Sequence, residues 1–302
     1  MMHLGLCCIF RDQPIKFRTT TATAIKKLSH DDGRKKLADL CASNAQALMD
    51  ALKFCSANDI GCFRVNSQIL PLKTHPDVGY ELEKLPDGRQ IVSQFRKCGA
   101  YAKSAGLRTA FHPDQFVVMN SPRPDVIEQS IAELEYQAEV AQWIGADVVN
   151  IHVGGAYGDK RAALRTFVRN LTRLPKKVRK LLTIENDDRV FTPANLVPFC
   201  REQGIPFVYD IHHHRCTPDG MSEEEATRQA LTTWDREPLF HISSPLEGWD
   251  GPNPRRHRDY INIRDFPAFW QGLDVTVEVE AKAKELAVRK LAKALARRAG
   301  AR

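Results

Sequence analysis

The sequence predicts an α/β fold and, within that class, a (β/α)8 barrel, also called a TIM barrel. Short runs rich in Val, Ile and Phe recur along the 302 residues, and segments with helical periodicity separate them. The runs lack a regular alternation of polar and apolar residues, which is typical of parallel strands covered on both faces. The length suits one such barrel, which typically takes about 250 residues. A doubly wound open sheet is the alternative that the same pattern allows.

Eight segments are expected to form the strands. In chain order they are residues 3–10, 62–67, 107–112, 147–152, 182–186, 206–211, 239–243 and 275–280. Eight strands that alternate with helices favour closure into a barrel. No linker, internal repeat or low-complexity tract divides the chain, so we expect one domain over residues 1–302, with a basic helix or tail from about residue 283.

The segments between these strands carry helical signals. Apolar residues recur at spacings of three and four, giving one stripe, in two sets: Leu37, Leu40, Leu48, Leu52 and Cys55, and Ile131, Leu134, Ala138, Ala141 and Ile144. Helix starts are expected at Pro193, at Ser222 and near Pro267. Helix-terminating glycines are expected at Gly61, Gly106, Gly145 and Gly204. Two long loops are predicted, over residues 11–34 and 69–90, at the strand ends where barrels bind substrates.

Composition narrows the class of protein. Hydrophobic residues make up 43% of the chain, which argues against disorder, and no run approaches the roughly 18 apolar residues that a membrane helix needs. The eight cysteines form no CxxC pair, so we expect no thiolate zinc site. Without an export signal the expected location is a reducing cytoplasm, where the thiols would be free and mostly buried. The net charge of +7 suits a polyanion such as nucleic acid.

Metal-ligating side chains follow the predicted strands. They are His112, His152, Glu185, Asp210 with His212, His213 and His214, His241 and Glu280, and two loops add His75 and His257. The carboxyl ends of barrel strands meet on one rim, so these side chains should converge. Any one of them could instead be a hydrogen-bonded structural residue. Because burying several unpaired charges is costly, their convergence favours a shared site of two or three Zn²⁺ or Mn²⁺ ions.

The chain also resembles the UV damage endonuclease family. The resemblance is carried by seven stretches, residues 4–8 (LGLCC), 17–21 (FRTTT), 63–67 (FRVNS), 111–116 (FHPDQF), 184–188 (IENDD), 240–244 (FHISS) and 280–287 (EAKAKELA), and it extends from about residue 4 to 291. It implies a TIM barrel related to endonuclease IV and a metal cluster, often of Mn²⁺, with Zn²⁺ or Mg²⁺ also possible. It further implies incision on the 5′ side of UV photoproducts, which leaves a 3′-hydroxyl and a 5′-phosphate.

The resemblance also implies roles for particular residues. Matched one by one, the metal ligands would be His75, His112, His152, Glu185, Asp210, His213, His241, His257 and Glu280. We interpret Glu185 as a bridging ligand, with Asp210 and Glu280 as the other catalytic carboxylates. Gln115 and Phe116 match a Gln-Tyr pair that members insert into the duplex at the lesion. The chain departs from the family at Leu6, where some members carry Tyr, and at Leu239, where some carry Lys.

The expected partner is double-stranded DNA that carries UV photoproducts, with no membrane and no obligatory protein partner. Lys16, Arg18, Arg255 and Arg256 are candidates to grip phosphates, and ordinary surface charge is the alternative. Phe116 could instead belong to the core. Three other functions stay open: an abasic-site endonuclease with the same cluster, a metal-dependent sugar isomerase or epimerase, and a catalytically inactive DNA-binding relative. In a prokaryote the expected location is the cytoplasm, at the nucleoid.

Overall fold

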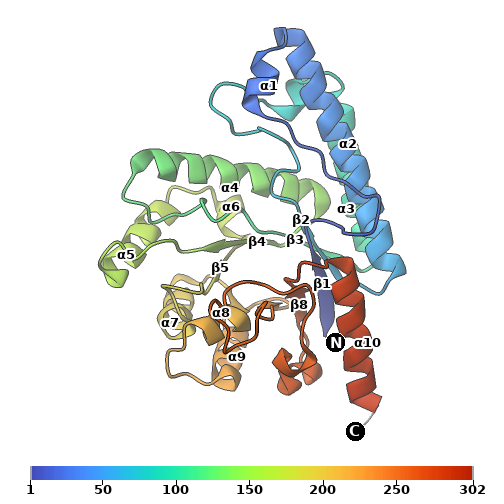
Figure 1. Ribbon diagram of the computed structural model, residues 1–302. Helices are drawn as coiled ribbons and strands as arrows, with labels where there is room; N and C mark the ends of the chain where they lie inside the picture. The colour runs from blue at the N-terminus through green and yellow to red at the C-terminus, as the bar shows by residue number, and fades with distance from the viewer. Residues whose placement is uncertain (1, 301–302) are drawn as a thin grey trace.

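The structure, a computed structural model, describes residues 2–300 and contains a closed barrel of eight parallel strands in the order β1 to β8 (Figure 1). The strands are β1 His3–Cys7, β2 Cys62–Val65, β3 Arg108–Phe111, β4 Val148–His152, β5 Leu182–Glu185, β6 Phe207–Asp210, β7 Leu239–Ile242 and β8 Thr276–Val279. Each strand pairs with the next, and β8 pairs with β1, so the sheet has no open edge. The (β/α)8 prediction is confirmed, and all eight predicted strands are present in slightly shorter form.

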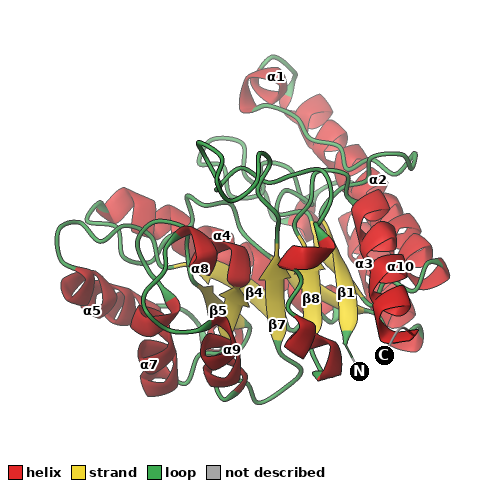
Figure 2. Cartoon of the chain, turned by 60° about the horizontal axis from the view of Figure 1, so that its bottom comes forward, coloured by secondary structure: helices red, strands yellow, loops and turns green. Residues whose placement is uncertain are grey.

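Helices surround the barrel, and loops gather at one end of it (Figure 2). The α-helices are α1 Ala22–Lys26, α2 His30–Ala57, α3 Gly88–Ser104, α4 Pro124–Ile144, α5 Lys160–Leu171, α6 Lys176–Arg179, α7 Pro193–Gln203, α8 Ile211–Cys216, α9 Glu223–Leu231 and α10 Glu285–Gly300. Three short 3₁₀ helices are η1 Leu82–Lys84, η2 Ile263–Asp265 and η3 Ala268–Gly272. None of the helices over residues 2–300 is both long enough and apolar enough to cross a membrane.

Helix boundaries follow local capping signals, which corrects two predictions. The predicted loop 11–34 contains α1 and the first turn of α2, because Ser29 caps α2 by accepting a hydrogen bond from the backbone of Asp32. Gly61 does not end a helix, since α2 is capped at Asn58. A Cβ atom on Gly61 would instead lie 2.7 Å from the Cβ of His3, so this glycine permits close packing of β1 against the start of β2.

The remaining predicted glycines do end helices. Gly106, Gly145 and Gly204 have φ values of 64°, 73° and 62°, in the left-handed region that glycine enters without a steric penalty. Pro193 begins α7 and Ser222 caps α9, as predicted. At Pro267 the chain forms the 3₁₀ helix η3 rather than an α-helix. All eight cysteines are free, and six of them are buried.

A small apolar cluster fills one level inside the barrel, separate from the main core between strands and helices. We call it the barrel floor, and it consists of Cys62, Ala110, Val148, Val208 and Leu239, with Trp234 packed against it. Leu239, at the position of the family lysine, therefore packs in a buried apolar layer and is 1% exposed. Because side chains alternate across a strand, residues two positions further along share the same inward face.

Candidate metal centre

Along the strands, the inward-facing side chains are apolar at the barrel floor and polar at the next inward position, two residues further along the chain. Above the barrel floor stand Arg64, His112, Asn150, Asp210 and His241, each two positions after a floor residue. β5 contributes Glu185 and β8 contributes Glu278 at the same level, and all of these side chains except His112 are buried. Strand alternation thus concentrates ionisable groups at the carboxyl end of the barrel, where TIM-barrel sites form.

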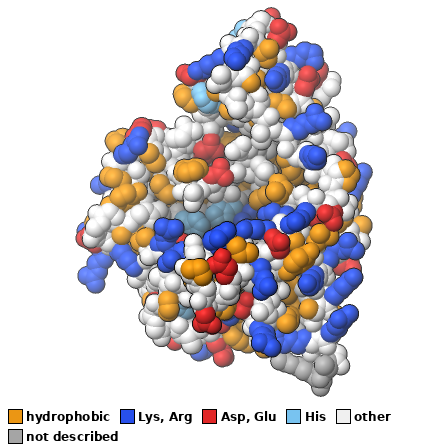
Figure 3. All heavy atoms as spheres, viewed as in Figure 1, with side chains coloured by type: hydrophobic (Ala, Val, Ile, Leu, Met, Phe, Trp, Pro, Cys, Tyr) orange, Lys and Arg blue, Asp and Glu red, His pale blue; other side chains and the backbone are white. Residues whose placement is uncertain are grey.

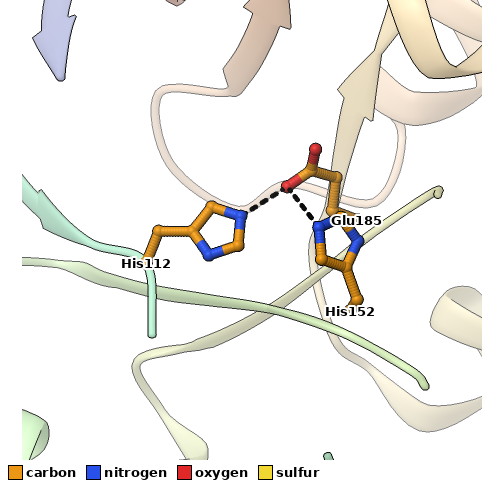
Figure 4. Close-up of side chains that lie close together, drawn as sticks. All are labelled: His112, His152 and Glu185. Atoms are coloured by element: carbon orange, nitrogen blue, oxygen red, sulfur yellow. Dashed lines mark hydrogen bonds and ion pairs between the residues drawn. The ribbon is translucent and has the colours of Figure 1, made fainter. Parts of the chain in front are cut away.

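The Glu185 carboxylate is the hub of this cluster. Its Oε2 atom lies 3.0 Å from His112 Nε2 and 3.9 Å from His152 Nε2, and accepts a hydrogen bond of 2.6 Å from Asn150 Nδ2. Figure 4 shows the rings of His112 and His152 turned towards the same carboxylate. Its Oε1 atom lies 3.1 Å from His241 Nδ1 and 3.3 Å from His213 Nδ1.

Electrostatics keep this carboxylate ionised. Burial by itself raises the pKa of Glu185, but the nearby imidazoles of His241, His152, His112 and His213 outweigh it and hold the pKa well below its usual value. Burial likewise lowers the pKa of His241, but Glu185 and Glu278 outweigh it and raise that pKa to about 10. Burial also lowers the pKa of His213, but Asp210 and Glu185 outweigh it and raise that pKa, whereas burial lowers the pKa of His152 to about 4. Without bound cations, His241 and His213 are therefore the histidines that hold protons to balance the carboxylates.

Two groups of three side chains have the geometry to hold a metal ion, and both include Glu185. One is His112, His152 and Glu185, and the other is Glu185, Asp210 and His241, with the ligand atoms of each group within 4.8 Å of one another. All of the donors are nitrogen or carboxylate oxygen, which suits Zn²⁺ or Mn²⁺.

Several of these donor atoms lack a hydrogen bond although they are buried. They are Glu185 Oε1, Asp210 Oδ2 and His241 Nδ1. Buried polar atoms are rarely left unsatisfied, because each costs about 1–3 kcal/mol. A centre of cations between the carboxylates and the imidazoles accounts for them, so the residues fit the implied metals.

The three consecutive histidines of α8 separate into different roles. His213 faces Glu185, and its backbone N–H donates to Asp210 Oδ1 at 2.7 Å. His214 points elsewhere, with its ring nitrogens at 2.7 Å from the Tyr209 hydroxyl and 3.0 Å from Asp219. His212 packs edge-on against the ring of His257, with 5.0 Å between centroids. The short helix thus directs a single member of the run to the centre.

Glu280 and His257 stand at the outer edge of the cluster. Glu280 Oε1 lies 3.5 Å from His241 Nδ1, and Glu280 Oε2 lies 3.8 Å from His257 Nδ1. Arg255 and Arg256 line a cavity of about 440 Å³ together with these two residues. Of the four predicted phosphate-gripping residues, these two are placed beside the cluster.

Other predicted site residues lie further out. His75 lines a separate cavity of about 680 Å³, where its Nδ1 accepts a hydrogen bond from the backbone of Asp77, and no hydrogen bond or ion pair within the described chain joins it to Glu185. Lys16 and Arg18 are exposed in the segment before α1. The structure thus brings eight of the nine predicted ligands together, namely Glu185, Glu280 and the six residues around them, and leaves His75 outside.

Phe116 is not a core residue, because 74% of its surface is exposed while Val117, Val118 and Met119 behind it are buried. Phe116 and its neighbour Gln115 border a cavity of about 520 Å³ that also contains His112 and Arg64. In Figure 3 histidine side chains lie at the bottom of a depression in the centre of the face shown, with Lys and Arg side chains beside it.

Arg64 and Glu278 are two site residues that sequence reasoning missed. The Arg64 side chain pairs with Glu278, lies 2.7 Å from Glu280 Oε1, and approaches His241 Nε2 to 3.0 Å. Burial raises the pKa of Glu278, but Arg64 and His241 outweigh it and lower the pKa to about 2. A signal was available, since each is a lone charge between apolar neighbours in a buried strand, at the inward positions of β2 and β8.

Comparisons with known proteins agree with the resemblance seen in the sequence. The family model described as UV-endonuclease UvdE matches residues 2–301. A UV DNA damage endonuclease of Bacillus cereus (strain B4264) is 33% identical over 282 residues, which cover 90% of this chain and 86% of that protein. The crystal structure of SacUVDE superposes with a TM-score of 0.87 at 28% identity, over 98% of this chain and 99% of that one. Endonuclease IV from Thermus thermophilus, with a TM-score of 0.61 at 16% identity over 83% of this chain and 93% of that one, shares the fold.

Proposed function

The chain belongs to the UV-endonuclease UvdE family of DNA repair endonucleases, and on this premise we propose that it nicks DNA on the 5′ side of UV photoproducts with two or three divalent metal ions. The observation that carries the proposal is the position of Glu185, whose two carboxylate oxygens face different sets of imidazoles. A carboxylate between two ligand groups is suited to bridge two cations.

The residues that would hold the ions are those of the cluster, with His75 included on the family resemblance alone. His112 and His152 would complete one side of Glu185, and Asp210 with His241 the other. When bound, such ions supply the positive charge that phosphodiester hydrolysis requires at the reacting phosphate. Mn²⁺ is the ion that the resemblance favours.

The rest of the cluster keeps these ligands in place. Asn150 donates to Glu185 Oε2, and Thr183 donates to Asn150 Oδ1 at 3.0 Å, so the carboxylate is oriented from below. Arg64 holds Glu280 and touches His241 from the opposite side. Such outer contacts fix the direction of ligand side chains and maintain their charge.

Exposed residues around the metal centre would contact damaged DNA. The exposed ring of Phe116 can stack on a base, and Gln115 can hydrogen-bond a base edge left without its partner. Because a photoproduct is already poorly stacked, displacing it costs less than displacing a normal base. Arg255 and Arg256, which line a cavity with Glu280, would contact phosphate groups.

A plasmid-nicking assay tests the proposal against its alternatives. Supercoiled plasmid would be used intact, UV-irradiated or rich in abasic sites, after removal of metal and with Mn²⁺, Zn²⁺ or Mg²⁺ restored. Metal-dependent nicking of the irradiated plasmid supports the proposal. Nicking confined to abasic plasmid would indicate an abasic-site endonuclease. Binding without nicking under every metal would indicate an inactive relative, and neither binding nor nicking would favour a sugar enzyme.

A further inference from the structure

One segment outside the metal centre carries an unusual concentration of positive charge. Residues 160–180, which contain α5 and α6, include nine Lys and Arg residues and no Asp or Glu. The formal charge of +9 in this segment exceeds the net charge of +7 of the whole chain. They are Lys160, Arg161, Arg165, Arg169, Arg173, Lys176, Lys177, Arg179 and Lys180, and all nine are exposed. Clustered like charges repel one another, so this segment calls for an anionic partner.

Four of these residues form a row along one side of α5 and its continuation. Arg161, Arg165, Arg169 and Arg173 recur every four positions, and we call them the arginine ridge. Residues four apart on a helix lie about 6 Å apart along its axis, so Arg161, Arg165 and Arg169 project from the same side of α5, and Arg173 follows just beyond its end.

Little of the ridge charge is neutralised within the protein. Arg173 pairs with Glu128 at 2.6 Å, and Arg165 lies 4.0 Å from Asp159. Arg169 donates only to the Thr166 hydroxyl, and Arg161 makes no ion pair within residues 2–300. The ridge therefore presents at least two unneutralised guanidinium groups and a third with only a long contact.

The ridge follows closely in the chain after a strand end of the metal centre. β4 ends at the cluster residue His152, and the loop that follows leads directly to Asp159, which caps the N-terminus of α5. Within this loop Tyr157 is 57% exposed and has a φ of 48°, a backbone conformation that bulky residues rarely adopt. Figures 1 and 2 show α5 at the outer edge of the barrel, where no other helix covers its outer side.

We propose that the arginine ridge binds the phosphate backbone of duplex DNA beyond the nicked site, as a second contact surface. The inference rests on the proposed function, which makes duplex DNA the substrate. Arginine forks bind phosphate oxygens in pairs, and a row of them can follow a strand backbone without reading sequence. An anionic membrane fits less well, because the apolar residues of α5, including Ala163 and Phe167, are buried against the barrel and cannot insert.

The test compares two triple variants that lose the same charge. One is R161Q/R165Q/R169Q in the ridge, and the matched control is R89Q/R96Q/K97Q on the exposed face of α3. Kd for undamaged duplex DNA, long and short, would be measured between about 50 and 200 mM salt. For the long duplex the ridge variant should reduce the slope of log Kd against log salt by about 2 to 3, since each lost phosphate contact contributes roughly 0.9. The control should change it by less than one.

Each outcome decides something. Equal loss of slope in both variants would mean a general charge effect and would overturn the ridge, as would an unchanged slope in the ridge variant. If the ridge variant bound vesicles of anionic lipid more weakly but bound DNA as before, the partner of the ridge would be a membrane surface and not DNA. Nicking of a short damaged duplex at saturation should be unaffected in both variants. If the unaltered protein nicks no damaged duplex with any metal, the proposed function fails while the salt slopes still report on the ridge.

Discussion

At the scale of single residues, the centre depends on buried carboxylates whose charge is balanced by neighbouring histidines. Glu185 is 1% exposed and Asp210 is 0% exposed, positions where an isolated carboxylate would be too costly to keep ionised. Histidines on neighbouring strands and the unused lone pairs of these oxygens make the arrangement suited to cations. Arg64 supplies the positive charge that balances the Glu278 and Glu280 carboxylates.

Changing Glu185→Ala should abolish nicking while leaving DNA binding nearly intact. The change removes the carboxylate shared by both ligand groups, whereas the proposed phosphate contacts lie elsewhere. Nicking rates and Kd for damaged duplex would be measured side by side, with Glu185→Gln as the isosteric control. A variant that nicks at close to the unaltered rate would show that Glu185 does not bridge the ions.

Changing Arg64→Ala should lower the free energy of unfolding by about 3–5 kcal/mol, because it leaves the Glu278 carboxylate buried without its cation. Urea denaturation measures the loss. The double variant R64A/E278Q should recover part of it, since the amide carries no charge. A loss of under about 1 kcal/mol in the single variant would mean that His241 alone balances Glu278.

At the scale of elements, five strands (β2, β3, β4, β6 and β7) supply an apolar residue to the barrel floor, and a polar residue of the centre follows two positions later. The loops after the strands extend the site outwards. The loop after β3 places Phe116 in solvent, and the loop after β4 joins the centre to α5. Strands thus set ligand positions within the rigid sheet, while loops carry the surfaces proposed to contact DNA.

Changing Phe116→Ala should weaken binding to UV-damaged duplex far more than binding to undamaged duplex, with metal content and melting temperature retained. A ring that is 74% exposed contributes little to the core, but stacking on a base is worth roughly 1–3 kcal/mol. Phe116→Tyr, which keeps the ring, serves as the control. Equal losses on both duplexes would sink the lesion-probing role.

At the scale of the whole molecule, barrel closure brings residues from seven of the eight strands, or from the loops just after them, into one centre. The pairing of β8 with β1 brings Glu278 and Glu280 near Arg64, more than two hundred residues away in the chain. Opening of the barrel and dispersal of the ligands are therefore one event, and bound metal should stabilise the entire fold.

We expect two or three transition-metal ions per folded chain. Elemental analysis of protein purified without chelator should give that ratio. Removing the ions should lower the melting temperature, and adding Mn²⁺ should restore it, because cations that bind only the folded state stabilise it by mass action. A ratio of one or none, with full nicking activity, would refute a multi-ion centre.

The sequence by itself determined the eight strands, their alternation with helices and most of the polar residues at the strand ends. These features are local, because apolar runs, capping residues and the period of two within a strand are all encoded by near neighbours. His112, His152, Glu185, Asp210 and Glu280 could therefore be named before any coordinate was known.

Only the tertiary structure decided which side chains meet. The pairing of Arg64 with Glu278 depends on barrel closure and register, which join residues 214 positions apart. The choice of His213 over its neighbours depends on the phase of the short helix α8, and the exposure of Phe116 depends on the path of a loop. Distances between distant segments are set by the packing of the whole chain, and no local pattern encodes them.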